Sequence, residues 1–116
     1  MEEVKLELIK KALDEKKGEN ITVYDVSTTS PICSYIVIAT ILNGRHGRSI
    51  AEELQEIQEK LGQRVRNFEG SDKDSWILVD LGDVIVHLFT EGERARVDLD
   101  TLIRKVNFLG ADNEKN

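Results

Sequence analysis

The sequence predicts an α/β fold, a single domain in which a mixed β-sheet of about five strands is covered by helices. Three observations lead to this prediction. The chain has 116 residues, which suits one compact domain. Some segments place apolar residues at helical spacing, whereas others are short and rich in β-branched residues. These segments alternate in the order αββαβββα, which is typical of a sheet with helices packed against it.

The first part of the chain predicts one helix and two strands. Residues 2–17 form an amphipathic helix that is expected to end at Gly18. Its apolar positions are Val4, Leu8, Ile9, Ala12 and Leu13. Residues 21–26 read as a strand, and a turn around the only proline follows. Residues 34–42 are apolar on both faces, which predicts a central strand covered on both sides.

The middle of the chain predicts a loop, a helix and a weak strand. Residues 43–49 contain two glycines and are expected to form a loop. Ser49 could then cap a helix, with Glu52 completing a capping box. Residues 63–68 alternate charged and apolar side chains, as an edge strand does. A polar turn is expected over residues 69–74.

The last part of the chain predicts two strands and a closing helix. Residues 76–80 and 84–89 are strands joined by a tight connection. Residues 90–94 read as a turn, and a short helix is expected within residues 98–107. The domain is expected to span residues 1–107, with a flexible tail over 108–116.

Charge and cysteine content limit the classes of function. The chain has 16 basic and 22 acidic residues, a formal net charge of −6, and both signs are spread over both halves. Without a basic arm, extended binding to a phosphate backbone is disfavoured, and a basic protein is the better partner for an acidic domain. The single cysteine, Cys33, excludes an intramolecular disulfide and a thiolate metal cage.

No apolar run approaches the roughly 18–20 residues that cross a bilayer, and the charged N-terminal segment does not resemble a signal peptide. We therefore expect a soluble cytoplasmic protein without a membrane segment.

Two aspartates and a histidine interrupt the apolar segment 76–89. Asp80 and Asp83 could bind Mg²⁺ or act together in general acid–base catalysis. However, they flank a connection that contains Gly82. Because aspartate side chains often bond to nearby backbone N–H groups in turns, a turn role is favoured. His87 points to the same side as Ile85 and is better explained as a buried, hydrogen-bonded side chain than as a ligand. We expect no metal and no cofactor.

Asp98 and Asp100 have the spacing of metal-dependent phosphoryl and nucleotidyl transfer. That chemistry also needs a phosphate-cradling loop, which the sequence lacks. Complementing the N-terminal charge of a helix explains these aspartates more simply.

Arg45, His46 and Arg48 cluster before the predicted helix, where they could hold an anion or form an ordinary solvated surface. Leu81 is expected to be exposed at a turn tip, and Trp76 begins a strand at the rim of the sheet. An apolar tip, a tryptophan and two aspartates together resemble a protein-docking patch, although Trp76 could equally belong to the core.

The segment WILVDLGDVIVHLF, residues 76–89, resembles the signature of the Iojap family of bacterial ribosomal silencing factors. Further matches are ITVYDV, ICSYIVIAT, RHGRSIAEEL, Glu69-Gly70 and VDLDTLI, so that the resemblance extends from about residue 9 to about residue 103. The chain departs from the pattern at Ser34, where the family has aspartate, and at Ile41, where it has glycine. It also lacks an aromatic residue before Asp98 and a tryptophan near Ile103.

The resemblance implies a fold related in shape to nucleotidyltransferases, without established catalysis. It also implies a translation repressor that binds the large ribosomal subunit, on its fourteenth protein, and blocks joining of the small subunit when nutrients are short. A homodimer when free, and ribosomal RNA contact that is at most peripheral, would be expected.

The residues carried over from the family motifs are partner-binding and structural. The partner-binding residues are Trp76, Asp80, Leu81, Asp83, Arg45 and His46, and the structural ones are Gly82 and His87. Two alternatives stay open, a metal-dependent nucleotidyltransferase that uses the aspartate pairs and an assembly factor of the large subunit.

Overall fold

The computed structural model describes residues 2–64, 68–71 and 73–115. Its elements are α1 (Glu2–Glu15), β1 (Glu19–Asp25), β2 (Tyr35–Ile41), α2 (Gly44–Lys60), β3 (Trp76–Asp80), β4 (Val84–Thr90), α3 (Glu91–Val97) and α4 (Leu99–Lys115). The expected α/β class is confirmed.

The described strands form one mixed sheet in the order β1-β2-β4-β3. The central strands β2 and β4 are parallel, and each outer strand runs antiparallel to its neighbour. This sheet has four strands rather than about five. Of the edge strand expected over residues 63–68, residues 65–67 lie outside the described residues and the others are not in a strand; Glu69 forms an isolated bridge to Leu78.

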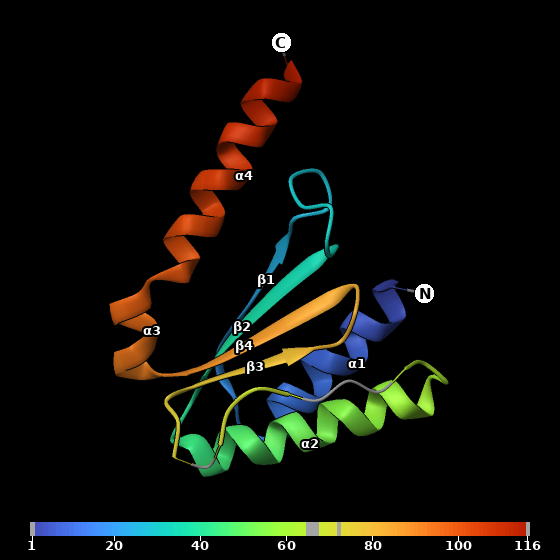
Figure 1. Ribbon diagram of the computed structural model, residues 1–116, viewed down its shortest axis with the longest axis vertical. Coiled ribbons are helices and arrows are strands. Elements are labelled where there is room, and N and C mark those ends of the chain that lie inside the picture. The colour runs from blue at the N-terminus through green and yellow to red at the C-terminus, as the bar shows by residue number, and fades with distance from the viewer. Residues whose placement is uncertain (1, 65–67, 72, 116) are drawn as a thin grey trace.

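Helices lie on both sides of the sheet, α1 and α2 on one side and α3 and α4 on the other (Figure 1). The larger core fills the space under α1 and α2. There the strands contribute Val37, Ala39, Ile41, Ile77, Val79, Val84, Val86 and Leu88. A smaller core, with Ile38, Phe89 and Ile103, lies under α4. Because β2 contributes to both cores, the prediction that residues 34–42 form a central strand is confirmed.

The buried face of α1 differs from the expected one. Ile9 and Leu13 are fully buried as predicted, but Val4 and Leu8 are 57% and 37% exposed. Lys5 takes a place on the buried face instead, with 2% exposure. The apolar pattern therefore predicted the helix correctly but identified its buried face slightly wrongly. A buried lysine looks like a surface residue in the sequence.

The helix α2 begins earlier than predicted, which corrects both the loop over 43–49 and the capping box at Ser49. Asn43 is the N-cap, and its side chain accepts a hydrogen bond from the His46 backbone N–H at 2.9 Å. Gly44 and Gly47 are buried on one helix face, and a Cβ at Gly47 would come within 2.7 Å of Ile77. These glycines allow close packing of the helix on the sheet rather than a loop.

The C-terminal region is more helical than predicted. Residues 91–97 form α3, whereas a turn was expected over 90–94, and α4 runs to Lys115 rather than ending near residue 107. Asp98 separates the two helices with a left-handed backbone (φ 52°). The division of the chain into a domain over 1–107 and a flexible tail stays a prediction.

The helix α4 leaves part of its side of the sheet uncovered. Strand alternation directs Trp76, Leu78, Asp80, Ile85 and His87 away from α1 and α2, and α4 packs mainly beside β1 and β2. We call this side of β3 and β4 the open face; Trp76, Leu78, Asp80 and Ile85 are at least partly exposed on it, and His87 is buried beneath Trp76. None of the four described helices combines the length and apolar character that crossing a membrane requires.

Candidate partner-binding site

Trp76 is an aromatic side chain held rigidly at the rim of the open face. It is the first residue of the edge strand β3 and is 39% exposed. Its Nε1 donates a hydrogen bond to His87 Nδ1 at 3.1 Å, and its ring centroid lies 4.9 Å from that of Phe89. The predicted position at the rim is confirmed, and the indole presents an immobilised aromatic surface to solvent.

His87 is a buried side chain that accepts the hydrogen bond from Trp76 and helps to hold the indole in place. The imidazole is 9% exposed and stacks on Phe89 at a centroid distance of 6.0 Å. Burial lowers the pKa of His87 from 6.5 to about 4, so the ring is neutral near pH 7. Because Nδ1 accepts from Trp76, Nε2 carries the proton. The structure therefore favours the predicted structural role.

Asp80, Gly82 and Leu81 build the connection between β3 and β4. Asp80 Oδ1 accepts a hydrogen bond from the Gly82 backbone N–H at 2.9 Å, as expected for an aspartate in a turn. Gly82 has φ +85°, a conformation that favours glycine. The Leu81 N–H donates to the Val84 carbonyl at 2.9 Å. These contacts fix the turn.

Lys5 joins α1 to this turn. Its ammonium group donates to the Leu81 carbonyl, to Gln63 Oε1 at 2.8 Å and to Asp83 Oδ1 at 2.8 Å. The lysine is 2% exposed and the Asp83 side chain 30%. Asp83 therefore has an internal partner, and its role in partner binding stays a prediction.

Two expectations about Leu81 are wrong. Its side chain is 1% exposed and belongs to the larger core, so it does not form an exposed turn tip. It also does not lie beside Trp76, because Trp76 begins β3 and Leu81 follows its end, so that five steps of extended chain, about 16 Å, separate them. A turn that closes over the core buries its middle residue, which the sequence pattern does not reveal.

Arg45 and His46 lie at the Trp76 end of the sheet, in the first turn of α2. His46 Nδ1 accepts from the Leu42 N–H at 3.0 Å, and Nε2 donates to the Lys16 carbonyl at 2.7 Å. Both ring nitrogens are thus used to connect α2 with the end of α1. Arg45 is exposed and available to a partner.

The aspartates of the catalytic alternative have structural partners. Asp100 accepts from Arg94 at 3.0 Å and from the Tyr24 hydroxyl at 2.5 Å. Burial raises its pKa, but these bonds outweigh that effect and hold the pKa below its ordinary value. Asp98 accepts from the Thr101 hydroxyl at 2.9 Å. Among the described residues, no three His, Cys, Asp or Glu side chains are grouped to hold a metal ion.

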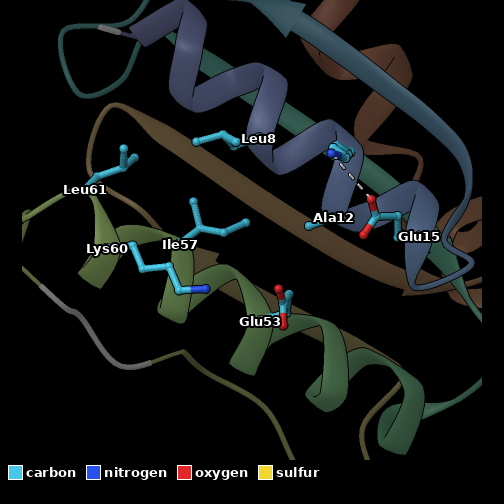
Figure 2. Close-up of a pocket in the computed structure, with 8 residues that line it drawn as sticks. Leu8, Ala12, Glu15, Glu53, Ile57, Lys60 and Leu61 are labelled. Carbon is cyan, nitrogen blue, oxygen red and sulfur yellow. Dashed lines mark ion pairs between the residues drawn. The ribbon is translucent and has the colours of Figure 1, made fainter.

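Among the hollows that the described residues line, two are of interest for binding. One, of about 490 Å³, lies beside Trp76 and is lined by Glu69, Gly70, Asp74, Trp76 and Leu78. The other, of about 230 Å³, lies between α1 and α2 (Figure 2). It is lined by Leu8, Lys11, Ala12, Glu15, Glu53, Ile57, Lys60 and Leu61. Sequence reasoning did not identify Glu69 and Asp74 as site residues, because only the Glu69–Leu78 bridge brings this polar turn onto β3.

Comparisons with known proteins identify the class of this fold and site. The family model described as "Ribosomal silencing factor during starvation" matches residues 1–115. The ribosomal silencing factor RsfS of Bacillus subtilis is 34% identical over 97 residues, which cover 84% of this chain and 82% of that protein. The chloroplastic Iojap protein of Zea mays is 30% identical over 90 residues, 78% of this chain and 39% of that longer protein.

Solved structures agree with this grouping. A crystal structure of a Chromobacterium violaceum protein superposes with a TM-score of 0.80 at 28% identity, covering 87% of this chain and 84% of that chain. One from Bacillus halodurans gives 0.74 at 31% identity, covering 88% and 94%. The names of the family and its members describe silencing of ribosomes, a form of translation regulation. The chain belongs to the ribosomal silencing factor family, and the resemblance to the Iojap family is confirmed.

Proposed function

We propose that this protein represses translation by binding the large ribosomal subunit, on its fourteenth protein, and blocking the small subunit, above all when nutrients are limiting. It acts in the cytoplasm as a binding protein rather than an enzyme. Its contact with ribosomal RNA is at most peripheral, and it pairs with a second copy when free. Membership of the family supports this role.

The observation that carries the proposal is the rigid, 39% exposed Trp76 on the open face. Tryptophan anchors are enriched among the residues that dominate binding energy at protein interfaces. The net charge of −6 supports a basic protein partner over naked RNA. Asp80 lies on the same face, and Arg45 is exposed at the Trp76 end of the sheet, so both can extend the contact.

Subunit joining tests the proposal. Large subunits are incubated with saturating protein, small subunits are added, and joined ribosomes are separated on a sucrose gradient. We expect fewer joined ribosomes with the wild-type protein, and near-normal joining with a folded Trp76→Ala variant. Normal joining in the presence of saturating wild-type protein would overturn the proposal.

A further inference from the structure

We infer that the hollow beside Trp76 receives a cationic side chain of the protein partner, an arginine or a lysine, held between the indole and the carboxylates of Glu69 and Asp74. This inference rests on the proposed function, in which the open face docks on a protein. It adds the chemistry that the partner must present at this position.

The described residues that line the hollow carry charge of one sign only. Glu69 and Asp74 are exposed, and no basic side chain occurs among the described residues that line it. A phosphate or nucleotide would be repelled by both carboxylates. An uncharged apolar group would contact the indole but would gain no attraction from the two carboxylates.

The walls of the hollow are preformed. Glu69 and Leu78 exchange two backbone hydrogen bonds, at 2.9 and 3.0 Å, which hold Glu69 against β3. Gly70 has φ +130°, and a Cβ there would come within 2.7 Å of Ile77 Cγ1, so the chain packs against β3 as only glycine permits. Asp74 Oδ2 accepts from the Ser71 N–H at 2.7 Å, which fixes its carboxylate.

The aromatic wall is preformed as well. The hydrogen bond to His87 and the contact with Phe89 hold the Trp76 ring, while 39% of the residue remains accessible. A cation over an indole face is attracted by the ring quadrupole. Arginine suits the site best, because a guanidinium group can stack on the ring and donate to carboxylates in one plane.

The test uses the full chain and the fact that Trp76 is its only tryptophan. Tryptophan fluorescence is followed during titration with a blocked tripeptide, Gly-Arg-Gly, and with the same peptide in which uncharged citrulline replaces arginine. We expect a saturable change with the arginine peptide and at least about fivefold weaker binding of the citrulline peptide, the size expected from a cation–π contact with partly exposed ion pairs.

Substitutions locate the effect. The double variant Glu69→Gln/Asp74→Asn is expected to weaken binding of the arginine peptide about fivefold or more. Glu56→Gln/Glu59→Gln removes the same charge from the exposed surface of α2 and is expected to change nothing. Equal affinity for the two peptides, or an unchanged affinity in the Glu69/Asp74 variant, would overturn the inference. A response to single-stranded RNA but not to the arginine peptide would overturn it too.

The same variants on ribosomes separate this inference from the proposed function. If wild type and the Glu69/Asp74 variant bind the large subunit equally well and with equal salt dependence, the inference fails and the function stands. If the peptide results hold but the wild type binds no subunit, the proposed function fails and the cation-binding hollow stands.

Discussion

Lys5 is the most deeply buried charged side chain among the described residues. It satisfies the carbonyl of Leu81 and the carboxylate of Asp83, and so connects the start of α1 to the turn between β3 and β4. Sequence reasoning assigned no role to it, because its three acceptors are distant in sequence and a lysine in an amphipathic pattern is normally solvated.

Replacing Lys5 by methionine keeps the aliphatic stem and removes the ammonium group. Asp83 and the buried Leu81 carbonyl then lose a donor, and we expect the free energy of unfolding to fall by about 2–3 kcal/mol. Urea unfolding measures the change. Lys10→Met, at a side chain that is 43% exposed, serves as the control and should stay within about 0.5 kcal/mol. Equal losses in the two variants would contradict the role of Lys5.

His87 gives a pH dependence with a defined sign. Its pKa is about 4 in the folded protein against 6.5 for the free side chain, so the unfolded chain binds the additional proton between these pH values. Its contribution to stability is complete above pH 6.5 and is lost as the pH falls to about 4. The total is about 3 kcal/mol.

Urea unfolding at several pH values tests this prediction in wild type and in His87→Gln. Wild type should lose more stability than the variant between pH 6.5 and 4, because glutamine does not titrate and can still accept from Trp76. Parallel losses in the two proteins, or an imidazole that titrates near pH 6.5 by NMR, would show the prediction to be wrong.

At the scale of elements, the segment that pairs with β3 depends on Gly70. A side chain at this position meets the Ile77 backbone and side chain and requires a strained φ of +130°. We expect Gly70→Ala to cost about 2 kcal/mol or more. Gly62→Ala, with φ +69° and free space, should cost about 1 kcal/mol. Gly92→Ala, in α3 without a clash, should be neutral or stabilising. Thermal unfolding of the three variants measures the order of these losses. Equal losses of stability at all three positions would show the prediction to be wrong.

The helices α3 and α4 are attached to the sheet by Arg94. Its guanidinium group donates to Asp100, to the Asn20 carbonyl at 2.7 Å and to the Thr40 hydroxyl at 3.0 Å. Arg94 and Asp100 are 15% and 14% exposed. No sequence rule links a residue of α3 to β1 and β2, which explains why this network was not predicted.

Removing Arg94 should loosen these helices selectively. Arg94→Met leaves the half-buried Asp100 without its hydrogen-bonded ion-pair partner, and we expect a loss of about 3 kcal/mol. Hydrogen exchange should increase over residues 99–107 more than in α1 and α2. Arg96→Met, which affects only an exposed pair with Glu93, is the control. If hydrogen exchange in the Arg94 variant increased equally in residues 99–107 and in α1 and α2, the proposed attachment would be wrong.

For the whole molecule, short segments rich in β-branched residues predicted the four strands of the sheet, and the apolar character of both faces of residues 34–42 predicted the central position of β2. The strand expected over residues 63–68 was the exception. The errors have common physical causes. Glycines that permit close helix packing look like loop residues, as at Gly44 and Gly47. A buried lysine looks like a surface residue. Of the geometry around the candidate site, the rim position of Trp76 and the turn role of Asp80 could be inferred from the sequence. The burial of Leu81 and the approach of Glu69 to β3 depend on tertiary packing.

We propose that the open face around Trp76 binds the large ribosomal subunit. Co-sedimentation with separated subunits tests it most directly, using wild type, Trp76→Ala and the control Val4→Ala, which removes an exposed apolar side chain on the opposite layer. Circular dichroism checks folding, and a Glu69→Lys/Asp74→Lys variant replaces Trp76→Ala if that variant unfolds.

We predict binding to the large subunit alone, about 30-fold weaker for Trp76→Ala and unchanged for Val4→Ala. A folded Trp76→Ala protein that binds the large subunit as tightly as wild type would show that Trp76 and the open face are not the docking site.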